Sequence, residues 1–304
     1  MVESIREYLG RSPLNGVLFM LLLVFAGASL FSFFGFVVCE LLLGIPLLSN
    51  PALMDDYSNP DIIAALRLMQ VLQAFGMLIL PSAVFIWVSS SAYKMKALFA
   101  MPKRQPVMLS IAFFMVAFPF INFLADWNSS IEIPTALGDW MSLKEEKAGT
   151  LTSLFLEMPT VELLLFNLVM IAVLPAVGEE LIFRGVIQRG LGNLVGNYHV
   201  AIWITAILFS AIHMQFFGFL PRMLMGAAMG YLLLWSGNLW YPIIAHLTNN
   251  GLSVILAFGI QHGHIQPNIE NAGLDNFGLA GFSLLFCLML MYLFKQVEGK
   301  KIGA

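Results

Sequence analysis

Two adjacent glutamates and an arginine lie in a stretch of sequence that is otherwise apolar enough for a lipid bilayer. Residues 179–184 read Glu-Glu-Leu-Ile-Phe-Arg. Ionisable side chains are costly to bury in hydrocarbon, so a cluster of them in an apolar helix indicates a functional site. Later apolar stretches contain His213 and His246, and Asn250 follows four residues after the second histidine. Carboxylate, imidazole and amide groups together are suited to activating water and stabilising an oxyanion.

The spacing within the charged cluster separates the two glutamates. Glu180 and Arg184 are four residues apart, so they share a helix face and can form an ion pair. Glu179 points about 100° away around the helix, so Arg184 cannot neutralise both carboxylates equally. One carboxylate is then left in a low-dielectric environment, where it can serve as a general base. A purely structural ion pair remains an alternative interpretation of Glu180 and Arg184 taken alone.

The two histidines each have a second notable side chain at helical spacing. Phe209 lies four residues before His213, and Asn250 lies four residues after His246. A single histidine or amide within the membrane is also typical of hydrogen bonds between helices. The joint occurrence of polar groups on three predicted helices favours one shared site, reachable by water. Pro175, one turn before Glu179, removes a backbone hydrogen bond and could open that helix to water.

The composition predicts a polytopic membrane protein. Hydrophobic residues make up 59% of the chain and charged residues 11%, where soluble domains have roughly 25% charged residues. The mean hydropathy is +0.85. No glycine-rich phosphate loop and no nucleic-acid-binding pattern occurs, so we expect no nucleic-acid partner. The cysteines, Cys39 and Cys287, both lie in apolar segments and are interpreted as unpaired core residues.

A membrane-spanning helix needs about 20 mostly apolar residues. On this basis we expect an all-α transmembrane bundle, a single membrane domain over residues 1–304 whose motif-bearing core is 160–260. The first apolar run is too long for a cleaved signal peptide and should remain as a span. The eight predicted spans are 16–48, 64–91, 107–125, 161–189, 199–219, 222–236, 239–260 and 277–295.

The distribution of basic residues predicts the orientation. Lysines and arginines concentrate before the first span, in the 94–104 loop, at the end of the fourth span and after residue 294. With eight spans, all of these fall on one side, which the positive-inside rule assigns to the cytoplasm along with both termini. The sizeable segment 126–160 falls outside, and we interpret it as lying on the membrane surface. The expected location is the cytoplasmic membrane of a prokaryote.

The three motifs together closely resemble the CPBP family, which comprises CAAX prenyl proteases and bacteriocin-processing enzymes and is also called the Abi family. The family pattern is EExxxR, FxxxH and HxxxN/D on successive membrane helices. It is matched here by Glu179-Glu180-x-x-x-Arg184, Phe209-x-x-x-His213 and His246-x-x-x-Asn250. The resemblance covers roughly residues 160–260. It implies an intramembrane endopeptidase whose partners are the bilayer and a membrane-associated, for example lipid-modified, peptide or protein.

The resemblance also implies roles for individual residues. Glu179 would activate water, and His213 would help to hold that water. His246 and Asn250 would stabilise the oxyanion. The site-ordering residues would be Glu180, Arg184 and Phe209.

No cofactor is clearly implied, although the family is often labelled metalloprotease. Two histidines and one glutamate with water as the fourth ligand form a catalytic zinc site in some enzymes. Here that set would be Glu179, His213 and His246. Because the chain has no HExxH motif, we favour the glutamate mechanism over a divalent metal.

Two other functional classes stay open. One is a non-catalytic member that acts as a bacteriocin-immunity or scaffold protein, although such a binder has no need for an activated carboxylate. The other is a transporter with a proton relay, which should show internal repeats or paired broken helices. Neither feature is found in the sequence.

Overall fold

The structure is a computed structural model that describes residues 2–89, 93–131, 133–274 and 276–299 of the 304-residue chain. Every regular element within these ranges is a helix, so the predicted all-α class is confirmed. The end of the basic C-terminal segment, 300–304, lies outside the described residues.

The N-terminal part of the chain forms a short helix followed by two long ones. The second helix begins with Pro13, whose fixed φ suits the first turn, and Ser12 caps it by accepting a hydrogen bond from the Leu14 N–H. Residues 60–89 form one continuous helix that includes a π-helical turn. The elements are α1 (Val2–Arg11), α2 (Pro13–Leu42), η1 (Pro51–Asp55), α3 (Pro60–Ala74), η2 (Phe75–Ile79) and α4 (Leu80–Ser89).

The remainder of the chain contains the three motifs. Its elements are η3 (Met95–Phe99), α5 (Arg104–Ser129), α6 (Thr135–Leu156), α7 (Val161–Asn167), η4 (Leu168–Val173), α8 (Leu174–Glu179), η5 (Glu180–Gln188), α9 (Arg189–Val195), α10 (Tyr198–Ala211), α11 (Phe219–Ser236), α12 (Trp240–Gln261), η6 (Pro267–Asn271) and α13 (Phe277–Glu298). The segments η4 and η5 are π-helical and interrupt a helix that runs from 161 to 195.

Six helices in the described part of the chain are long and apolar enough to cross a membrane. The other two predicted spans correspond to α10 and α11, of 14 and 18 residues. The predicted fifth span, 199–219, was wrong at its C-terminal end, because the helix stops at Ala211 and Met214 turns the backbone with a φ of 55°. The number of helices in the membrane is therefore close to the expected eight.

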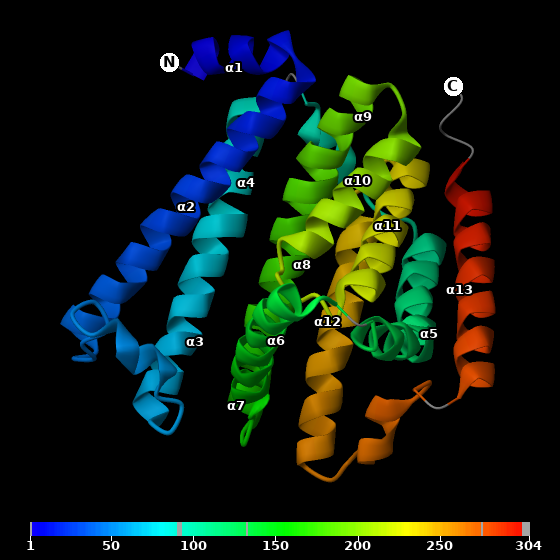
Figure 1. Cartoon of the computed structure of the whole chain (residues 1–304). Helices are drawn as coiled ribbons and strands as arrows, with labels where there is room; N and C mark the ends of the chain where they lie inside the picture. The colour runs from blue at the N-terminus through cyan, green and yellow to red at the C-terminus, as the bar shows by residue number, and fades with distance from the viewer. Residues whose placement is uncertain (1, 90–92, 132, 275, 300–304) are drawn as a thin grey trace.

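The helices form a bundle with the site-bearing helices in its middle. In Figure 1, α2, α3 and α4 lie on one side and α13 lies on the other. Packing contacts join α5 to α13 and α12, α10 to α11, and α12 to η4. The start of α1 and the end of α13 lie at the same end of the bundle (Figure 1), as an even number of crossings requires.

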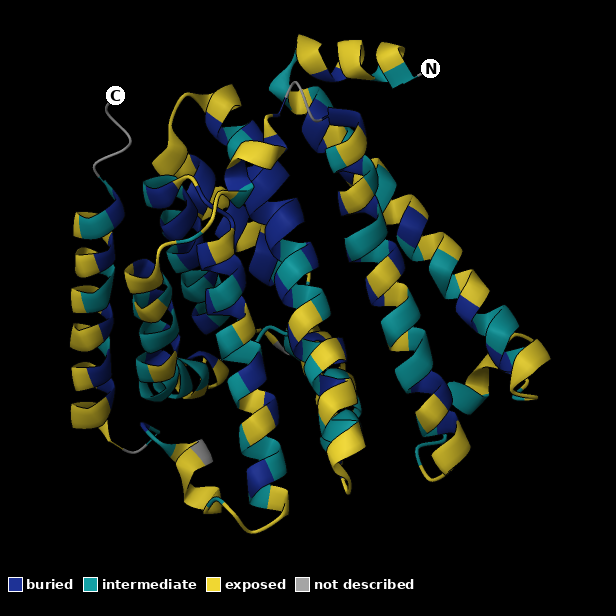
Figure 2. Ribbon diagram, turned by 180° about the vertical axis from the view of Figure 1, so that it is seen from behind, coloured by how far each residue is buried: buried dark blue, intermediate teal, exposed yellow. Residues whose placement is uncertain are grey.

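The outer surface of the bundle is apolar. Figure 2 shows buried residues concentrated among the central helices, while the outward faces of α2 and α13 are exposed. The exposed side chains include Phe25 and Leu41 on α2 and Phe282 and Leu285 on α13, each at least 60% accessible. A continuous apolar exterior of this kind suits contact with lipid. The chain is an integral membrane protein. Both cysteines are buried and free, as predicted.

Glycines allow the N-terminal helices to approach the site-bearing helix closely. A Cβ atom on Gly27 of α2 would lie 1.9 Å from the carbonyl oxygen of Gly76 in η2. A Cβ atom on Gly178 of α8 would lie 2.4 Å from the Leu78 side chain. These close contacts fix α2, η2 and α8 against one another, directly before the first motif glutamate.

We expect Gly27→Ala to lower the free energy of unfolding by about 1–3 kcal/mol, because the added methyl group meets backbone rather than a flexible side chain. Thermal unfolding of the purified protein in detergent measures the change. Gly149→Ala on α6 is the matched control, since its Cβ meets nothing within 4 Å. Equal effects of the two substitutions would contradict close packing at Gly27.

Candidate active site

A buried ion pair lies where η5, which bears the first motif, meets α12, which bears the third. Glu180 Oε1 accepts one hydrogen bond from Arg184 Nη1 at 2.8 Å and is 2.9 Å from His246 Nδ1. The Glu180 and Arg184 side chains have no accessible surface. Arg184 also donates through Nη2 to the Gly226 carbonyl on α11, at 2.9 Å. The predicted pairing of Glu180 with Arg184 is therefore present, and it links η5 to α11 and α12.

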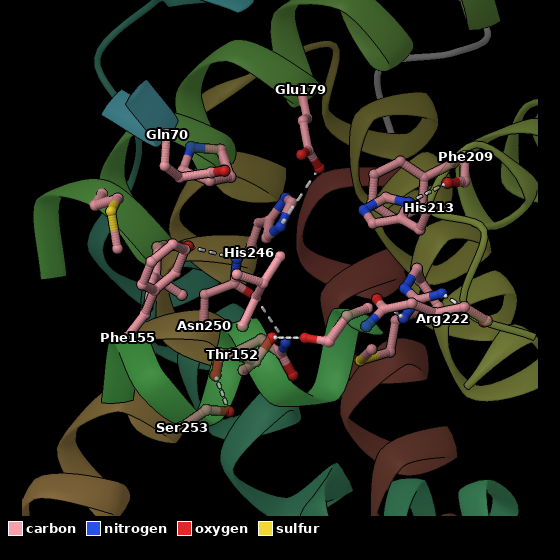
Figure 3. A pocket seen from close by; sticks show the side chains of 18 of the residues that line it. Gln70, Thr152, Phe155, Glu179, Phe209, His213, Arg222, His246, Asn250 and Ser253 are labelled. Atoms are coloured by element: carbon pink, nitrogen blue, oxygen red, sulfur yellow. Dashed lines mark hydrogen bonds and ion pairs between the residues drawn. The ribbon is translucent and has the colours of Figure 1, made fainter. Parts of the chain in front are cut away.

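Glu179 lies apart from this ion pair. Its Oε2 is 3.9 Å from His246 Nε2, and its side chain keeps 13% of its accessible surface. Figure 3 shows the carboxylate pointing into a cavity toward His246. The two neighbouring glutamates thus have different surroundings: Glu180 is bonded to Arg184, while Glu179 faces open space.

Phe209 is a central packing residue between the two histidines. Its ring centroid lies 5.0 Å from the His213 ring and 6.0 Å from the His246 ring. The Arg184 guanidinium lies 4.7 Å from the same centroid, close enough for a cation–π contact. Phe183 packs against it edge-on at 5.2 Å. The aromatic residue of the FxxxH motif therefore orients both imidazoles and the arginine.

Hydrogen bonds orient the two histidine rings. His213 Nδ1 lies 2.7 Å from the Phe209 carbonyl oxygen. Since a carbonyl only accepts, Nδ1 carries the hydrogen, and Nε2 of a neutral ring is left as an acceptor. His246 is held in the same way by the Glu180 carboxylate at Nδ1, so that its Nε2 is directed to Glu179. His213 lies just after α10, in the connection to α11, rather than inside a long span as predicted.

A proline contributes to the position of Asn250. Pro175 has no N–H, so it cannot donate to the Ile171 carbonyl four residues earlier. Asn250 Nδ2 donates to that carbonyl at 3.1 Å, and Asn249 Nδ2 donates to Asn250 Oδ1 at 3.0 Å. One N–H of the Asn250 amide remains for a further acceptor. The π-helical segments on either side of α8 are a feature often found at functional sites.

A cavity of about 610 Å³ brings the predicted residues together. Glu179, Phe209, His213, His246 and Asn250 all line it, whereas Glu180 and Arg184 are buried behind its wall. The remaining lining residues are mainly apolar or neutral. They include Gln70, Leu151, Thr152, Phe155, Gln215, Arg222, Met225, Asn249 and Ser253.

Sequence reasoning did not identify the contribution of α6. The segment 126–160 was predicted to lie on the membrane surface, but Leu151, Thr152 and Phe155 of α6 line the cavity. Arg67 on α3 holds the end of this helix by donating to the Leu154 and Glu157 carbonyls, both at 3.0 Å. The four-residue spacing of apolar side chains at 151 and 155 was the available signal, but the charged middle of the segment masked it.

An ion pair holds the middle of α6 to η1. Lys147 Nζ lies 2.9 Å from Asp55 Oδ1. The hydrogen bond from Lys147 lowers the pKa of Asp55, and the same bond raises the pKa of Lys147. Both side chains are mostly exposed, so this contact orients α6 rather than contributing much stability.

The helix α11 approaches η5 through two glycines. A Cβ atom on Gly230 would lie 2.7 Å from Gln188 Oε1, and one on Gly226 would lie 3.4 Å from Arg184 Nη2. Gln188 Nε2 donates to the Gly230 carbonyl at 3.0 Å, one turn beyond the bond from Arg184 to Gly226. The spacing of small residues in 226–230 predicts close packing, which the structure shows. The role of Gln188 was not predicted.

The side chains that could ligate a metal ion were compared with the zinc set considered from the sequence. No group of three or more His, Cys, Asp or Glu side chains in the described part of the chain is placed to hold a metal ion. Glu179, His213 and His246, the set considered for zinc, are therefore not grouped as ligands in this arrangement.

Comparison with known proteins finds a match in the part of the chain that contains the three motifs. Residues 161–252 match the family model described as Type II CAAX prenyl endopeptidase Rce1-like. The resemblance to the CPBP family is confirmed over these residues. This Rce1-like segment, 161–252, begins at α7 and ends in α12, and it contains all three motifs. It falls within the predicted core 160–260.

One curated relative shares part of the sequence. The Uncharacterized protein YpbD of Bacillus subtilis (strain 168) is 27% identical over 104 residues, which are 33% of this chain and 49% of that protein. The chain thus spans about half the length of the curated relative it matches. No solved structure matches the chain.

We expect Arg184→Met to lower the free energy of unfolding by about 3–5 kcal/mol, because it leaves Glu180 buried and charged without its partner. The double substitution Glu180→Gln with Arg184→Met should cost less than Arg184→Met alone, since no buried charge is then unpaired. Unfolding in detergent measures both. Arg11→Met, in an exposed ion pair with Glu7, is the control. A double variant less stable than the single one would contradict the argument.

Proposed function

We propose that this protein is an intramembrane endopeptidase that hydrolyses a peptide bond of a membrane-associated peptide or protein, with Glu179 as the general base. The observation that carries the proposal is the separation of the two glutamates. Arg184 is bonded to Glu180, so the Glu179 carboxylate is free to face the cavity and accept a proton. The match of residues 161–252 to a peptidase family supports the same activity.

The proposed reaction uses the side chains that line the cavity. Glu179 takes a proton from water while His213 Nε2 accepts the other hydrogen of that water and positions it. The resulting hydroxide adds to the carbonyl carbon of the peptide bond. The oxyanion accepts hydrogen bonds from His246 Nε2–H and Asn250 Nδ2–H. Glu179 then gives its proton to the leaving amine nitrogen, and the C–N bond breaks.

The charges of the site suit this proposal. Glu179 and Glu180 carry two negative charges, and Arg184 supplies one positive charge. With His246 in its imidazolium form, Nδ1–H donates to Glu180 and Nε2–H is available to the oxyanion. The two glutamates, Arg184 and His246 then have a net charge of zero. A zero net charge favours the burial of the whole group in a low-dielectric site.

The cavity supports a substrate that resides in the bilayer. Its wall combines apolar side chains of α6, η4 and α11 with a few polar groups. A membrane-anchored precursor, such as a lipid-modified protein or a bacteriocin leader peptide, fits this lining. We further propose that both termini face the cytoplasm of a prokaryotic cell, as the basic residues indicate.

We expect Glu179→Gln to reduce cleavage by about 10²–10⁴-fold, because the amide cannot accept the proton from water. Cleavage of a library of acyl-anchored fluorogenic peptides by protein in phosphatidylcholine vesicles measures the rate. Glu162→Gln, an exposed glutamate at the start of the same long helix, is the control and should retain the full rate. A fully active Glu179→Gln protein would refute the assigned base.

We expect the rate to persist after dialysis against a strong zinc chelator, because the candidate ligands Glu179, His213 and His246 are not grouped as a metal site. The peptide assay measures the rate before and after dialysis. Loss of activity that returns when Zn²⁺ is added would contradict the metal-free mechanism and assign these residues as ligands.

A further inference from the structure

Arg222 brings an unneutralised positive charge to the cavity. Among the described residues that line the cavity, it is the one lysine or arginine, and Glu179 is the one acid. Its guanidinium donates to the Gln215 carbonyl at 3.2 Å and to Gln215 Oε1 at 2.9 Å. Both acceptors are neutral. Within the described part of the chain, Arg222 forms no ion pair.

The other partly buried arginines do not resemble Arg222. Arg67 donates to carbonyls at the end of α6, and Arg189 donates to the carbonyls of Tyr93 and Gly185. Neither lines the cavity. Arg67 and Arg189 bond to backbone carbonyls within the packed bundle, whereas Arg222 is held by Gln215 alone and lines the cavity. Figure 3 shows it on the same side of the cavity as His213.

The register of α11 against η5 places Arg222 level with the ion pair. Arg184 bonds to Gly226 and Gln188 bonds to Gly230, and both pairs are 42 residues apart. Two contacts with the same offset mean that the helices run in the same direction. One turn earlier, this offset pairs Glu180 with Arg222. Packed helix axes are about 8–10 Å apart, so Arg222 lies near the reacting bond of a substrate held at Glu179.

The nearest acids do not neutralise Arg222 directly. The charges of Glu145 and Glu179 attract it from beyond ion-pair distance. Glu145 Oε2 accepts instead from the Phe217 N–H at 3.3 Å. Glu179 is the proposed base and needs its lone pairs for water. A guanidinium beside a partly apolar cavity is more stable when an incoming anion neutralises it.

We propose that Arg222 binds the C-terminal carboxylate of the substrate, which rests on the proposed peptidase function. A peptide has one carboxylate that its backbone always supplies, and the planar guanidinium matches a carboxylate in shape. The oxyanion already has His246 and Asn250 as donors. An extended chain advances about 3.3–3.6 Å per residue, so the peptide end lies a few residues beyond the cleaved bond.

The test compares two acyl-anchored fluorogenic peptides of one sequence, one ending in a free carboxylate and the other in an amide. In phosphatidylcholine vesicles we expect the wild-type protein to cleave the acid about 10- to 100-fold more efficiently in kcat/KM, the range expected for hydrogen bonds to a charged group. Arg222→Gln should lower cleavage of the acid and bring the ratio of acid to amide close to one. Arg222→Lys should retain part of the preference.

Two controls separate charge from structure. Gln215→Ala removes the side-chain acceptor of Arg222 but keeps the backbone acceptor and the charge of Arg222, so the acid preference should remain. Arg104→Gln, an exposed arginine at the start of α5, should leave both rates unchanged. If Arg222→Gln lowers the cleavage of both peptides equally, Arg222 only shapes the loop after His213, and the proposal is overturned. A wild-type protein that does not discriminate the acid from the amide overturns it as well.

A binding measurement keeps this inference separate from the proposed reaction. Fluorescence anisotropy of both peptides with the Glu179→Gln protein should show tighter binding of the acid, and a further Arg222→Gln change should remove this preference. If the wild-type protein cleaves neither peptide, the peptidase function fails while this measurement still decides the role of Arg222. Equal binding of acid and amide overturns the proposal. Loss of the preference in vesicles that contain phosphatidylglycerol would show that Arg222 binds lipid phosphate instead.

Discussion

The ion pair between Glu180 and Arg184 is the constraint on which the rest of the site depends. In a low-dielectric interior these charges are tolerated because they are paired with each other and bonded to further groups. Glu180 meets Arg184 and His246, while Arg184 also meets the Gly226 carbonyl and the Phe209 ring. Four helical segments, η5, α10, α11 and α12, are therefore joined at one point. Their joining sets the relative positions of the groups that face the cavity.

This constraint also explains why two adjacent glutamates can serve different purposes. Consecutive residues of a helix point about 100° apart, so one carboxylate turns to the packed interior while its neighbour turns to the cavity. The interior carboxylate orients His246 through Nδ1, and the cavity carboxylate faces the other nitrogen of the same ring. A single imidazole thus connects the structural glutamate to the proposed base.

The sequence was sufficient to predict the convergence of Glu179, His213, His246 and Asn250. Polar side chains in apolar helices avoid lipid by facing one another inside the bundle. The sequence was not sufficient for α6 or for Arg222. A charged amphipathic segment and a cation at a helix end are both usual at membrane surfaces, so neither pattern distinguished a cavity wall from an interface. The end of the fifth span was missed because the apolar run continues past Ala211, where the backbone turns.

Pro175 shows that the three motifs are an incomplete description of the site. The Ile171 carbonyl lacks its usual donor because a proline follows four residues later, and an amide 79 positions away in the chain takes that place. A homologous segment could therefore keep all the motif letters, yet hold its asparagine in a different orientation if the imino acid were replaced. A sequence search that also requires a proline one turn before the two adjacent glutamates would separate relatives that share this arrangement from those that share only the motifs.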